Sequence, residues 1–381
     1  MDGLPGGSRP TCVLVLQGGG ALGAYHIGAY RALQEQRFEP DWVCGISVGA
    51  INAAVIAGNP PDRRLERLQA LWDAISWPEL LPAADTVAAR RWTNTLGYAQ
   101  TMAFGQPGFF APRPINPYLA LPGPAATSFY DTSPLYETLR RFADFDRLNN
   151  PSSARLSVGA TDVETGGLVF FDNRCMAGRF GPEHVVASGS LPPGFPPTPI
   201  GGRLYWDGGC VSNTPLEAVL DDMPVGRSMV FVIDLWSASG PPPVTMDEVQ
   251  ARAKQILYAS RTAHHVDSVA TKVNLRHAMQ LLAGDGPKTD QRMDIVHIVY
   301  HPGEDQITAS DAEFSRASIA ERHDAGYADM RRALEAAPWH RAQTPAHLGC
   351  IVHRVTPDAV TTFAEPNLGR TTDRRAAALP S

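Results

Sequence analysis

The amino-acid sequence predicts an α/β fold of three layers, in which helices cover both faces of a mostly parallel central sheet. Residues 13–75 alternate between short apolar runs and helical periodicities, in the order strand, helix, strand, helix. The strand-like runs are apolar throughout, which is typical of parallel strands buried on both faces. The chain has 381 residues, of which 44% are apolar, and this is enough to bury the core of one large domain or two smaller ones.

The first elements follow one another closely. Residues 12–16, CVLVL, predict a buried strand, and residues 21–36 predict an amphipathic helix. Residues 41–47, DWVCGIS, predict a second short strand. The nearly all-apolar residues 48–58 predict a buried helix, and residues 62–75 predict an amphipathic one.

Residues 77–133 differ because they are rich in proline and aromatic residues and show no clear periodicity. An irregular segment of this length within a compact fold is usually functional or mobile. Its Phe/Pro/Leu-rich part, residues 104–135, fits two interpretations equally: a lid or channel at a binding site, and a packed irregular excursion. As a lid, it would expose Phe109, Phe110 and Tyr118 and favour contact with lipid.

The chain is predicted to form one main region, residues 11–335, with a core at 13–235 and an extension at 245–335 packed on it. Residues 336–381 form a C-terminal segment whose end, from Asn367, we expect to be disordered. The later predicted elements are a helix at 133–142 capped by Ser133, a hairpin at 155–172, a helix at 183–190, a strand at 228–236, long helices at 245–283, a strand at 293–302 and a helix at 310–335.

Composition argues against several classes of protein. A net charge of −6 and the lack of any run of Lys or Arg argue against a nucleic-acid partner. The five cysteines are scattered and none forms a C-x-x-C pair, so we expect neither a disulfide framework nor a metal site. The N-terminus lacks the apolar stretch of a signal peptide, and the apolar runs are far shorter than the ~20 residues that span a bilayer. We therefore expect a cytoplasmic protein, with peripheral contact to membrane surfaces left open.

The sequence GGGALG, residues 18–23, follows the first strand and opens the first helix. Through Gly18, Gly20 and Gly23 it matches the G-x-G-x-x-G pattern of dinucleotide-binding loops. Such a loop is accompanied by an acidic residue at the end of the second strand, but the candidate here, Asp41, precedes that strand. Nucleotide binding is therefore the less favoured interpretation.

A second motif, GISVG at residues 45–49, lies where the second strand meets the buried helix. A G-x-S-x-G in this context is typical of a nucleophilic serine on a sharp turn, in which Gly45 and Gly49 leave no side chain beside Ser47. In a parallel sheet the glycine loop and Ser47 lie at the same edge. We therefore expect the N–H groups of the loop to stabilise the oxyanion that forms when Ser47 attacks a carbonyl group.

A serine hydroxyl needs a neighbouring base to take its proton. In an α/β-hydrolase this base is a histidine, and the eleven histidines of this chain leave that alternative open. The order of the elements argues against it, because the α/β-hydrolase serine follows several strands, whereas only two precede Ser47.

Three motifs in this order, GGGALG, GISVG and DGG at residues 207–209, resemble those of the patatin-like phospholipases. The segment ASGSLPPGFPP, residues 187–197, is similar to the one that precedes the aspartate in this family. The resemblance covers residues 13–235, and the later part resembles the extension of many bacterial members. It implies the three-layer patatin-like fold and hydrolysis of a lipid acyl ester, such as a phospholipid, without a metal ion or cofactor.

The same resemblance implies a catalytic dyad of Ser47 as nucleophile and Asp207 as general base. A carboxylate is a weak base in water, and burial beside the helix after Ser47 is expected to raise its pKa. The chain departs from the family at Leu22, where many members have Arg or Lys, so the resemblance implies no side-chain cation at that point. The implied oxyanion donors are the N–H groups of Gly18, Gly19, Gly20 and Ala21, and the supporting glycines are Gly23, Gly45, Gly49, Gly208 and Gly209.

Several matters stay open at the level of sequence. The head group, the acyl-chain length, the position of the ester and the oligomeric state are not determined, and a thioester or a storage-polymer ester would use the same chemistry. A histidine-based esterase, a nucleotide-binding protein and an inactive scaffold that docks on membranes remain as alternatives. Other residues near the motifs are interpreted as structural, with the two cysteines as buried fillers: His26, His184, Asp162, Cys44 and Cys210.

Overall fold

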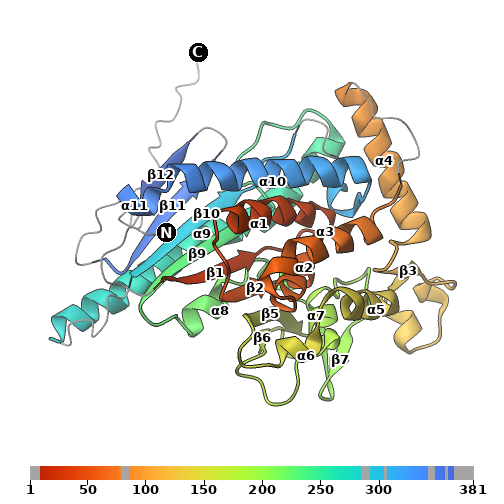
Figure 1. The fold of residues 1–381 in the computed structure, drawn as a ribbon. Helices are drawn as coiled ribbons and strands as arrows, with labels where there is room; N and C mark the ends of the chain where they lie inside the picture. Colours follow the sequence, from red (N-terminus) through yellow and green to blue (C-terminus); the bar gives the residue numbers. More distant parts are fainter. Residues whose placement is uncertain are drawn as a thin grey trace, which may run out of the picture.

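The computed structural model contains a wide mixed sheet with helices on both faces (Figure 1). The residues that the structure describes are 9–78, 86–284, 292–303, 307–341, 348–356 and 359–363. The disorder predicted from Asn367 onwards lies outside these residues. Within the described ranges, no helix has an apolar stretch of the length needed to cross a bilayer.

The strands of the described chain form one large sheet and one small pair. The large sheet consists of β1 (Thr11–Leu16), β2 (Trp42–Gly45), β5 (Arg155–Asp162), β6 (Leu168–Asp172), β7 (Thr198–Ile200), β8 (Arg203–Asp207), β9 (Arg227–Asp234), β10 (Arg292–Val299), β11 (Cys350–Val355) and β12 (Val360–Phe363). The small pair is β3 (Ala111–Pro112) with β4 (Tyr130–Asp131).

The order of strands in the large sheet is β12-β11-β10-β9-β1-β2-β5-β8-β7, and β6 pairs with β5 outside this path. Every pairing from β11 to β5 along this order is parallel. The antiparallel strands β6, β7, β8 and β12 lie toward the two sides. The predicted α/β fold with a mostly parallel sheet is therefore confirmed.

Helices cover both faces of this sheet (Figure 1). The principal helices are α1 (Tyr25–Glu35), α2 (Val48–Ala57), α3 (Arg64–Ile75), α4 (Val87–Phe104), α5 (Ser133–Phe142), α6 (Phe145–Leu148), α7 (Pro182–Ser188), α8 (Leu216–Asp221), α9 (Met246–Leu282), α10 (Arg316–Ala336) and α11 (Pro338–Arg341). Short 3₁₀ helices include η1 (Gly20–Ala24), which leads into α1, and η6 (Ser310–Ala312). Side chains of α1, α2, α3 and α10 belong to the apolar cluster on one face, and those of α8 and of residues 266–273 in α9 belong to the cluster on the other.

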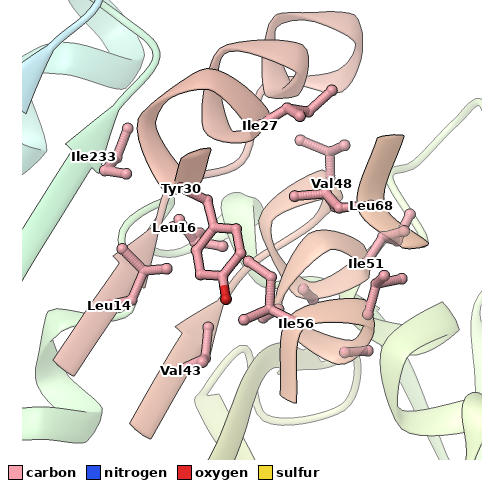
Figure 2. Packing of buried hydrophobic residues seen from close by; sticks show 14 of the residues in the cluster. Leu14, Leu16, Ile27, Tyr30, Val43, Val48, Ile51, Ile56, Leu68 and Ile233 are labelled. Atoms are coloured by element: carbon pink, nitrogen blue, oxygen red, sulfur yellow. The ribbon is translucent and has the colours of Figure 1, made fainter. Parts of the chain in front are cut away.

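Successive residues of the central strands alternate between these two apolar clusters, which explains why the strands are apolar throughout. In β1, Leu14 and Leu16 belong to the cluster with α1 and α2, while Val13 and Val15 belong to the cluster with α8 and α9. Figure 2 shows the first cluster, in which Tyr30 of α1 lies above the strands. The three-layer arrangement follows from this alternation.

The structure differs from the sequence expectation in several places, and the long helices expected at 245–283 form a single helix, α9. Residues 87–104 form α4 within the segment expected to be irregular, because a helix whose buried side chains include Asn94 and Thr101 shows no apolar stripe. The N-cap of α5 is Thr132 instead of Ser133. Strands β11 and β12 continue the sheet with residues after 335, where no strand was expected, while the hairpin at 155–172 is confirmed.

Helices α1 and α10 cross in backbone contact, because each contributes a glycine at the crossing. A Cβ atom on Gly28 would lie 1.7 Å from the carbonyl oxygen of His323, and one on Gly326 would lie 2.0 Å from that of Tyr25. The Tyr25 hydroxyl also donates a hydrogen bond to Asp329, at 2.7 Å. Helix α10 therefore packs directly on the helix that follows the glycine loop.

We expect Gly28→Ala to destabilise the fold, because α1 and α10 must move apart to admit a methyl group against a backbone carbonyl. Overpacking of this kind lowers the free energy of unfolding by ~1–3 kcal/mol. Urea unfolding followed by circular dichroism measures the effect. The control is Gly167→Ala in the β5–β6 turn, where a Cβ atom would meet only a hydroxyl oxygen at 3.3 Å. Equal midpoints for the two variants would contradict the close crossing.

Candidate active site

Ser47 lies at a sharp turn between β2 and α2. Its backbone angles, φ 56° and ψ −127°, are rare for a residue other than glycine, and such strain concentrates at functional sites. A Cβ atom on Gly45 would lie 2.3 Å from the carbonyl oxygen of Gly49, and one on Gly49 would lie 2.2 Å from that of Leu16. The Ser47 N–H lies 3.1 Å from both the carbonyl oxygen and the hydroxyl of Ser188 and donates to them. The turn therefore needs both glycines, and hydrogen bonds to Ser188, the last residue of α7, fix its position.

The glycine loop after β1 is anchored by its first residue. The Gly18 N–H donates to the carbonyl oxygen of Asn213 (3.1 Å), and the Gly18 carbonyl accepts from Asn213 Nδ2 (2.8 Å) and Trp236 Nε1 (2.9 Å). Gly19 and Gly20 follow at the wall of a cavity. Gly20 has φ +54°, and a Cβ atom there would lie 2.1 Å from the carbonyl oxygen of Asp311.

Two of the four expected oxyanion donors are placed differently from the expectation. The Gly18 N–H is not free to bind a ligand, because Asn213 accepts its hydrogen bond. Ala21 is fully buried and is not part of the cavity wall, which Gly19 and Gly20 do form. The loop therefore brings two of its four expected donor residues to the cavity.

Asp207 is the last residue of β8, and its carboxyl group is buried. Its Oδ1 accepts a hydrogen bond from the Gly209 N–H at 2.7 Å, whereas its Oδ2 has no hydrogen-bond partner within the described chain. Burial raises the pKa of Asp207 from 3.8 to about 7, and the Ser47 hydroxyl and the Gly209 N–H act in the opposite direction. This carboxyl group therefore exchanges its proton near neutral pH.

The register of the sheet brings Asp207 level with Ser47. Strand β2 ends at Gly45, which is opposite Val158 of β5. Strand β5 continues beyond that point to Ala160, which is opposite Asp207. The Ser47 hydroxyl is near enough to lower the pKa of Asp207, but it does not form a hydrogen bond of ordinary geometry with Oδ2. Such bonds are often long before a substrate is bound.

Ser47, Asp207, Gly19 and Gly20 lie together on the wall of a cavity of ≈ 340 Å³. Asn213 and Asp311, which lie beside the glycine loop, also line the cavity, and the rest of the wall is mainly apolar. Its apolar side chains include Ile51, Met102, Phe110, Leu191, Trp236 and Phe314. A cavity with a few polar groups at one point and apolar walls suits a ligand that is largely hydrocarbon.

The Phe/Pro/Leu-rich segment contributes to this wall. Phe109 and Phe110 line the cavity and are buried, so they are not the exposed residues expected of a lid. The ring of Phe110 packs against those of Tyr130 and Phe195, with centroids 4.9 Å away in both cases. Tyr118, in contrast, is exposed as expected.

The histidines considered in the sequence have structural surroundings. His26 is buried, burial lowers its pKa to about 3, and its Nδ1 lies 3.1 Å from the amide nitrogen of Asn52. His184 accepts a hydrogen bond from the Gly181 N–H at 2.9 Å. Among the described residues, no histidine borders the cavity. The geometry therefore gives no support to a histidine base.

Other residues near the motifs also lie apart from the cavity. Asp41 accepts a hydrogen bond from the Cys12 N–H (2.8 Å), at the edge of the sheet where β1 begins, so it is not at the edge that a nucleotide-binding loop would require. Asp162 accepts from the N–H groups of the β5–β6 turn. Cys44 is buried as expected, whereas Cys210 is exposed.

Arg322 of α10 binds three backbone carbonyl groups in and beside the glycine loop, and no pattern in the sequence pointed to it. The buried guanidinium donates from Nη1 to the carbonyl oxygens of Ala21 (3.2 Å) and Glu313 (2.9 Å), and from Nη2 to that of Ser310 (3.0 Å). The buried Glu313 carboxylate lies 3.6 Å from the same guanidinium.

The sequence analysis also missed Asn213 and Trp236, which bind the backbone of Gly18. Of these two residues, only Asn213, six residues after Asp207, lies near a motif.

Comparison with known families identifies two matching regions. The family model described as patatin-like phospholipase matches residues 14–220. A second model, described as patatin phospholipase, matches residues 286–346, which include Arg322.

Relatives match this chain over part of its length. The mouse protein named patatin-like phospholipase domain-containing protein 6 is 25% identical over 227 residues, which are 60% of this chain and 14% of the mouse protein. The Caenorhabditis elegans protein named patatin-like phospholipase domain-containing protein ZK370.4 is 44% identical over 59 residues. These residues are 16% of this chain and 4% of the worm protein. The chain thus spans a small part of the curated relatives that it matches.

Two solved structures match this chain with low TM-scores. VipD from Legionella pneumophila has a TM-score of 0.38 and 12% identity, and the match covers 86% of this chain and 67% of VipD. The ExoU–SpcU complex from Pseudomonas aeruginosa has a TM-score of 0.34 and 17% identity, over 94% of this chain and 54% of the other.

We expect Asp207→Asn to raise thermal stability at pH 8 and to have little effect near pH 4. The raised pKa of Asp207 means that its neutral form is the stable one in the fold. Its contribution to stability is therefore fully present below about pH 4 and is lost as the pH rises through about 7. Calorimetry at the two pH values measures Tm, with a rise on the order of 2 °C or more at pH 8. Asp62→Asn, on an exposed turn, controls for the loss of charge. A gain that is independent of pH would show that burial of the charge is not its cause.

We expect Arg322→Met to lower the free energy of unfolding by ~3–5 kcal/mol, because it leaves Glu313 as an unpaired buried carboxylate. The double variant Arg322→Met, Glu313→Gln should recover part of this loss. Urea unfolding of both variants measures these free energies. The control is Arg331→Met, which removes an exposed ion pair with Glu335 on the same helix and should change the free energy of unfolding by less than ~1 kcal/mol. A similar small change for Arg322→Met would mean that the buried guanidinium does not hold these segments.

Proposed function

Because the chain belongs to the patatin-like phospholipase family, we propose that it hydrolyses carboxylic esters of lipids, with Ser47 as nucleophile and Asp207 as general base. One observation carries this proposal. The buried Oδ2 of Asp207 has no partner within the described chain, and it lies beside a strained serine on the wall of an apolar cavity. An acceptor without a donor in this position suits the transient binding of a proton.

In the first half of the proposed reaction, ionised Asp207 accepts the proton of Ser47 Oγ while that oxygen forms a bond to the ester carbonyl carbon. The N–H groups of Gly19 and Gly20 stabilise the resulting oxyanion, and the N-terminus of α2 adds a favourable electrostatic contribution. The carbon–oxygen bond of the ester then breaks. The proton passes from Asp207 to the departing alcohol, and the acyl group stays on Ser47.

In the second half, Asp207 accepts a proton from water, whose oxygen attacks the acyl carbonyl carbon. The same two N–H groups stabilise the second oxyanion. When it collapses, the proton returns to Ser47 Oγ, and the carboxylic acid leaves the cavity. The raised pKa of Asp207 supports this role, because a base whose pKa is near the working pH transfers protons in both directions.

The apolar wall supports a lipid acyl chain as the part of the substrate that the cavity binds. Aromatic and aliphatic side chains surround the space beyond Ser47, and the charged groups of the wall are the carboxylates Asp207 and Asp311. An acyl chain that enters this space displaces water from the reacting atoms and strengthens their electrostatic interactions.

The extent of the catalytic unit is part of the same proposal. We take residues 11–335 as the hydrolase region, with a core at 13–235 and an extension at 245–335, and the contact of α10 with α1 supports this choice. Strands β11 and β12 add to the sheet from residues outside this region. A cytoplasmic location is also a proposal, and the five unpaired cysteines support it.

A fluorophosphonate probe, which modifies an activated serine, tests the proposed dyad. We expect the unaltered chain to be labelled, Ser47→Ala to stay unlabelled, and Asp207→Asn to react at least ~10²-fold more slowly. The labelling rate of the unaltered chain should rise between about pH 6 and pH 8, because ionised Asp207 is the reactive form and its pKa is about 7.

The matched control is Asp162→Asn, which removes another buried carboxylate at the end of a neighbouring strand and should leave labelling intact. A panel of esters that differ in acyl-chain length follows for the labelled forms. Undiminished labelling of Ser47→Ala, or an unlabelled parent chain, would refute the proposal.

A further inference from the structure

The loop between β3 and β4 exposes several large apolar side chains within a short stretch. Ile115, Tyr118, Leu119 and Leu121 are 57%, 85%, 82% and 88% exposed, respectively. We call residues 113–129 the apolar loop. Isolated exposed apolar residues are common on soluble proteins, but a contiguous group marks an interaction surface.

The exposure of these side chains is fixed by the loop's own hydrogen bonds. Asn116 Oδ1 accepts from the Tyr118 N–H (3.0 Å), and the Asn116 carbonyl accepts from the Leu119 N–H (2.9 Å). The two ends of the loop are joined, since the Arg113 N–H donates to the carbonyl of Phe129 at 3.0 Å. The ring of Tyr118 packs edge-on against that of Phe129. The loop therefore holds a folded shape in which its apolar side chains face outward.

The base of the apolar loop is hydrogen-bonded to a segment of the cavity wall. The Phe129 N–H donates to the Pro193 carbonyl (3.3 Å), and the Tyr130 N–H donates to the Gly194 carbonyl (2.9 Å). Tyr130, Pro193 and Gly194 all line the cavity that contains Ser47. In Figure 1 the β3 region lies at the periphery of the molecule, beyond the sheet. A surface bound by the loop would therefore lie beside the cavity.

The charge of this segment indicates which kind of surface it fits. Residues 104–130 contain one charged residue, Arg113, and no Asp or Glu, although 19% of the whole chain is charged. The guanidinium of Arg113 is tied to Ser128 Oγ at the base of the loop (3.0 Å). Insertion of residues 113–129 into an apolar phase thus removes no carboxylate from water, and Asp131 of β4 is the nearest carboxylate in the sequence. A tyrosine beside two leucines is suited to the boundary between water and hydrocarbon.

We propose that the apolar loop docks this protein on the surface of a phospholipid bilayer, with the side chains of Tyr118, Leu119 and Leu121 inserted among the lipids. The proposal rests on the proposed function in one respect: docking would bring the mouth of the cavity to the lipids that carry the ester. Binding of the bilayer is independent of hydrolysis and is tested without it.

The test measures co-sedimentation with phosphatidylcholine vesicles in a Ser47→Ala background, where no ester is consumed. We expect Leu119→Ser, Leu121→Ser to weaken vesicle binding by about tenfold or more for each inserted leucine. The matched control is Val225→Ser, Leu282→Ser, which removes side chains that are 78% and 88% exposed, one just before β9 and one at the end of α9, and should bind as the parent does. Binding should also persist in 0.5 M NaCl, because it depends on apolar contact.

In the catalytically intact chain, the loop variant should hydrolyse a short-chain, water-soluble ester at the parental rate and a vesicle-borne ester at least about tenfold more slowly. Unchanged vesicle binding by the loop variant, or equal losses in the control, would overturn the proposal. So would a dimer of the parent chain that the loop variant abolishes, because the loop would then bind a second copy. A parent chain that binds vesicles but hydrolyses neither ester would refute the proposed function and leave the docking surface supported.

Discussion

The candidate site depends on backbone contacts that leave no space for a side chain at the carboxyl edge of the sheet. The turn at Ser47 exists because Gly49 approaches the carbonyl oxygen of Leu16, and Gly208 approaches that of Gly159 in the same way, with a Cβ atom there only 2.6 Å from the oxygen. Both contacts draw short loops onto neighbouring strands. Three turns that are far apart in the chain therefore meet at one cavity, and the positions of the reactive groups follow from the packing of main chain on main chain.

Burial of Asp207 links reactivity to stability. The fold buries this carboxyl group with one N–H donor, from Gly209, and the resulting rise in its pKa makes the charged form less favourable than it is in water. The same environment makes the carboxylate a stronger base than it would be in water. A site of this kind is less stable than a neutral equivalent, and the remaining core must compensate for it.

The later part of the chain belongs to the site as much as the first part does. Trp236 holds the carbonyl oxygen of Gly18, and Phe314 forms part of the cavity wall. Arg322 donates a hydrogen bond to the carbonyl oxygen of Ala21, one residue before Leu22. In this chain a guanidinium thus reaches the backbone of the glycine loop from α10, and Arg322 itself is not among the residues that line the cavity.

The sequence by itself determined the alternation of strands and helices, the apolar character of the central strands and the turn at Ser47, because each depends on periodicity or on glycines a few residues apart. The family motifs added Asp207, and the direction of the shift in its pKa followed from burial. Only the tertiary structure decided that Asn213 accepts the Gly18 N–H and that Arg322 supports Ala21. These contacts join residues 195 and 301 positions apart, and no local pattern records which distant residues will meet. Helix α4 was hidden for a related reason, since its position is set by contacts of polar and half-buried side chains and it shows no apolar stripe.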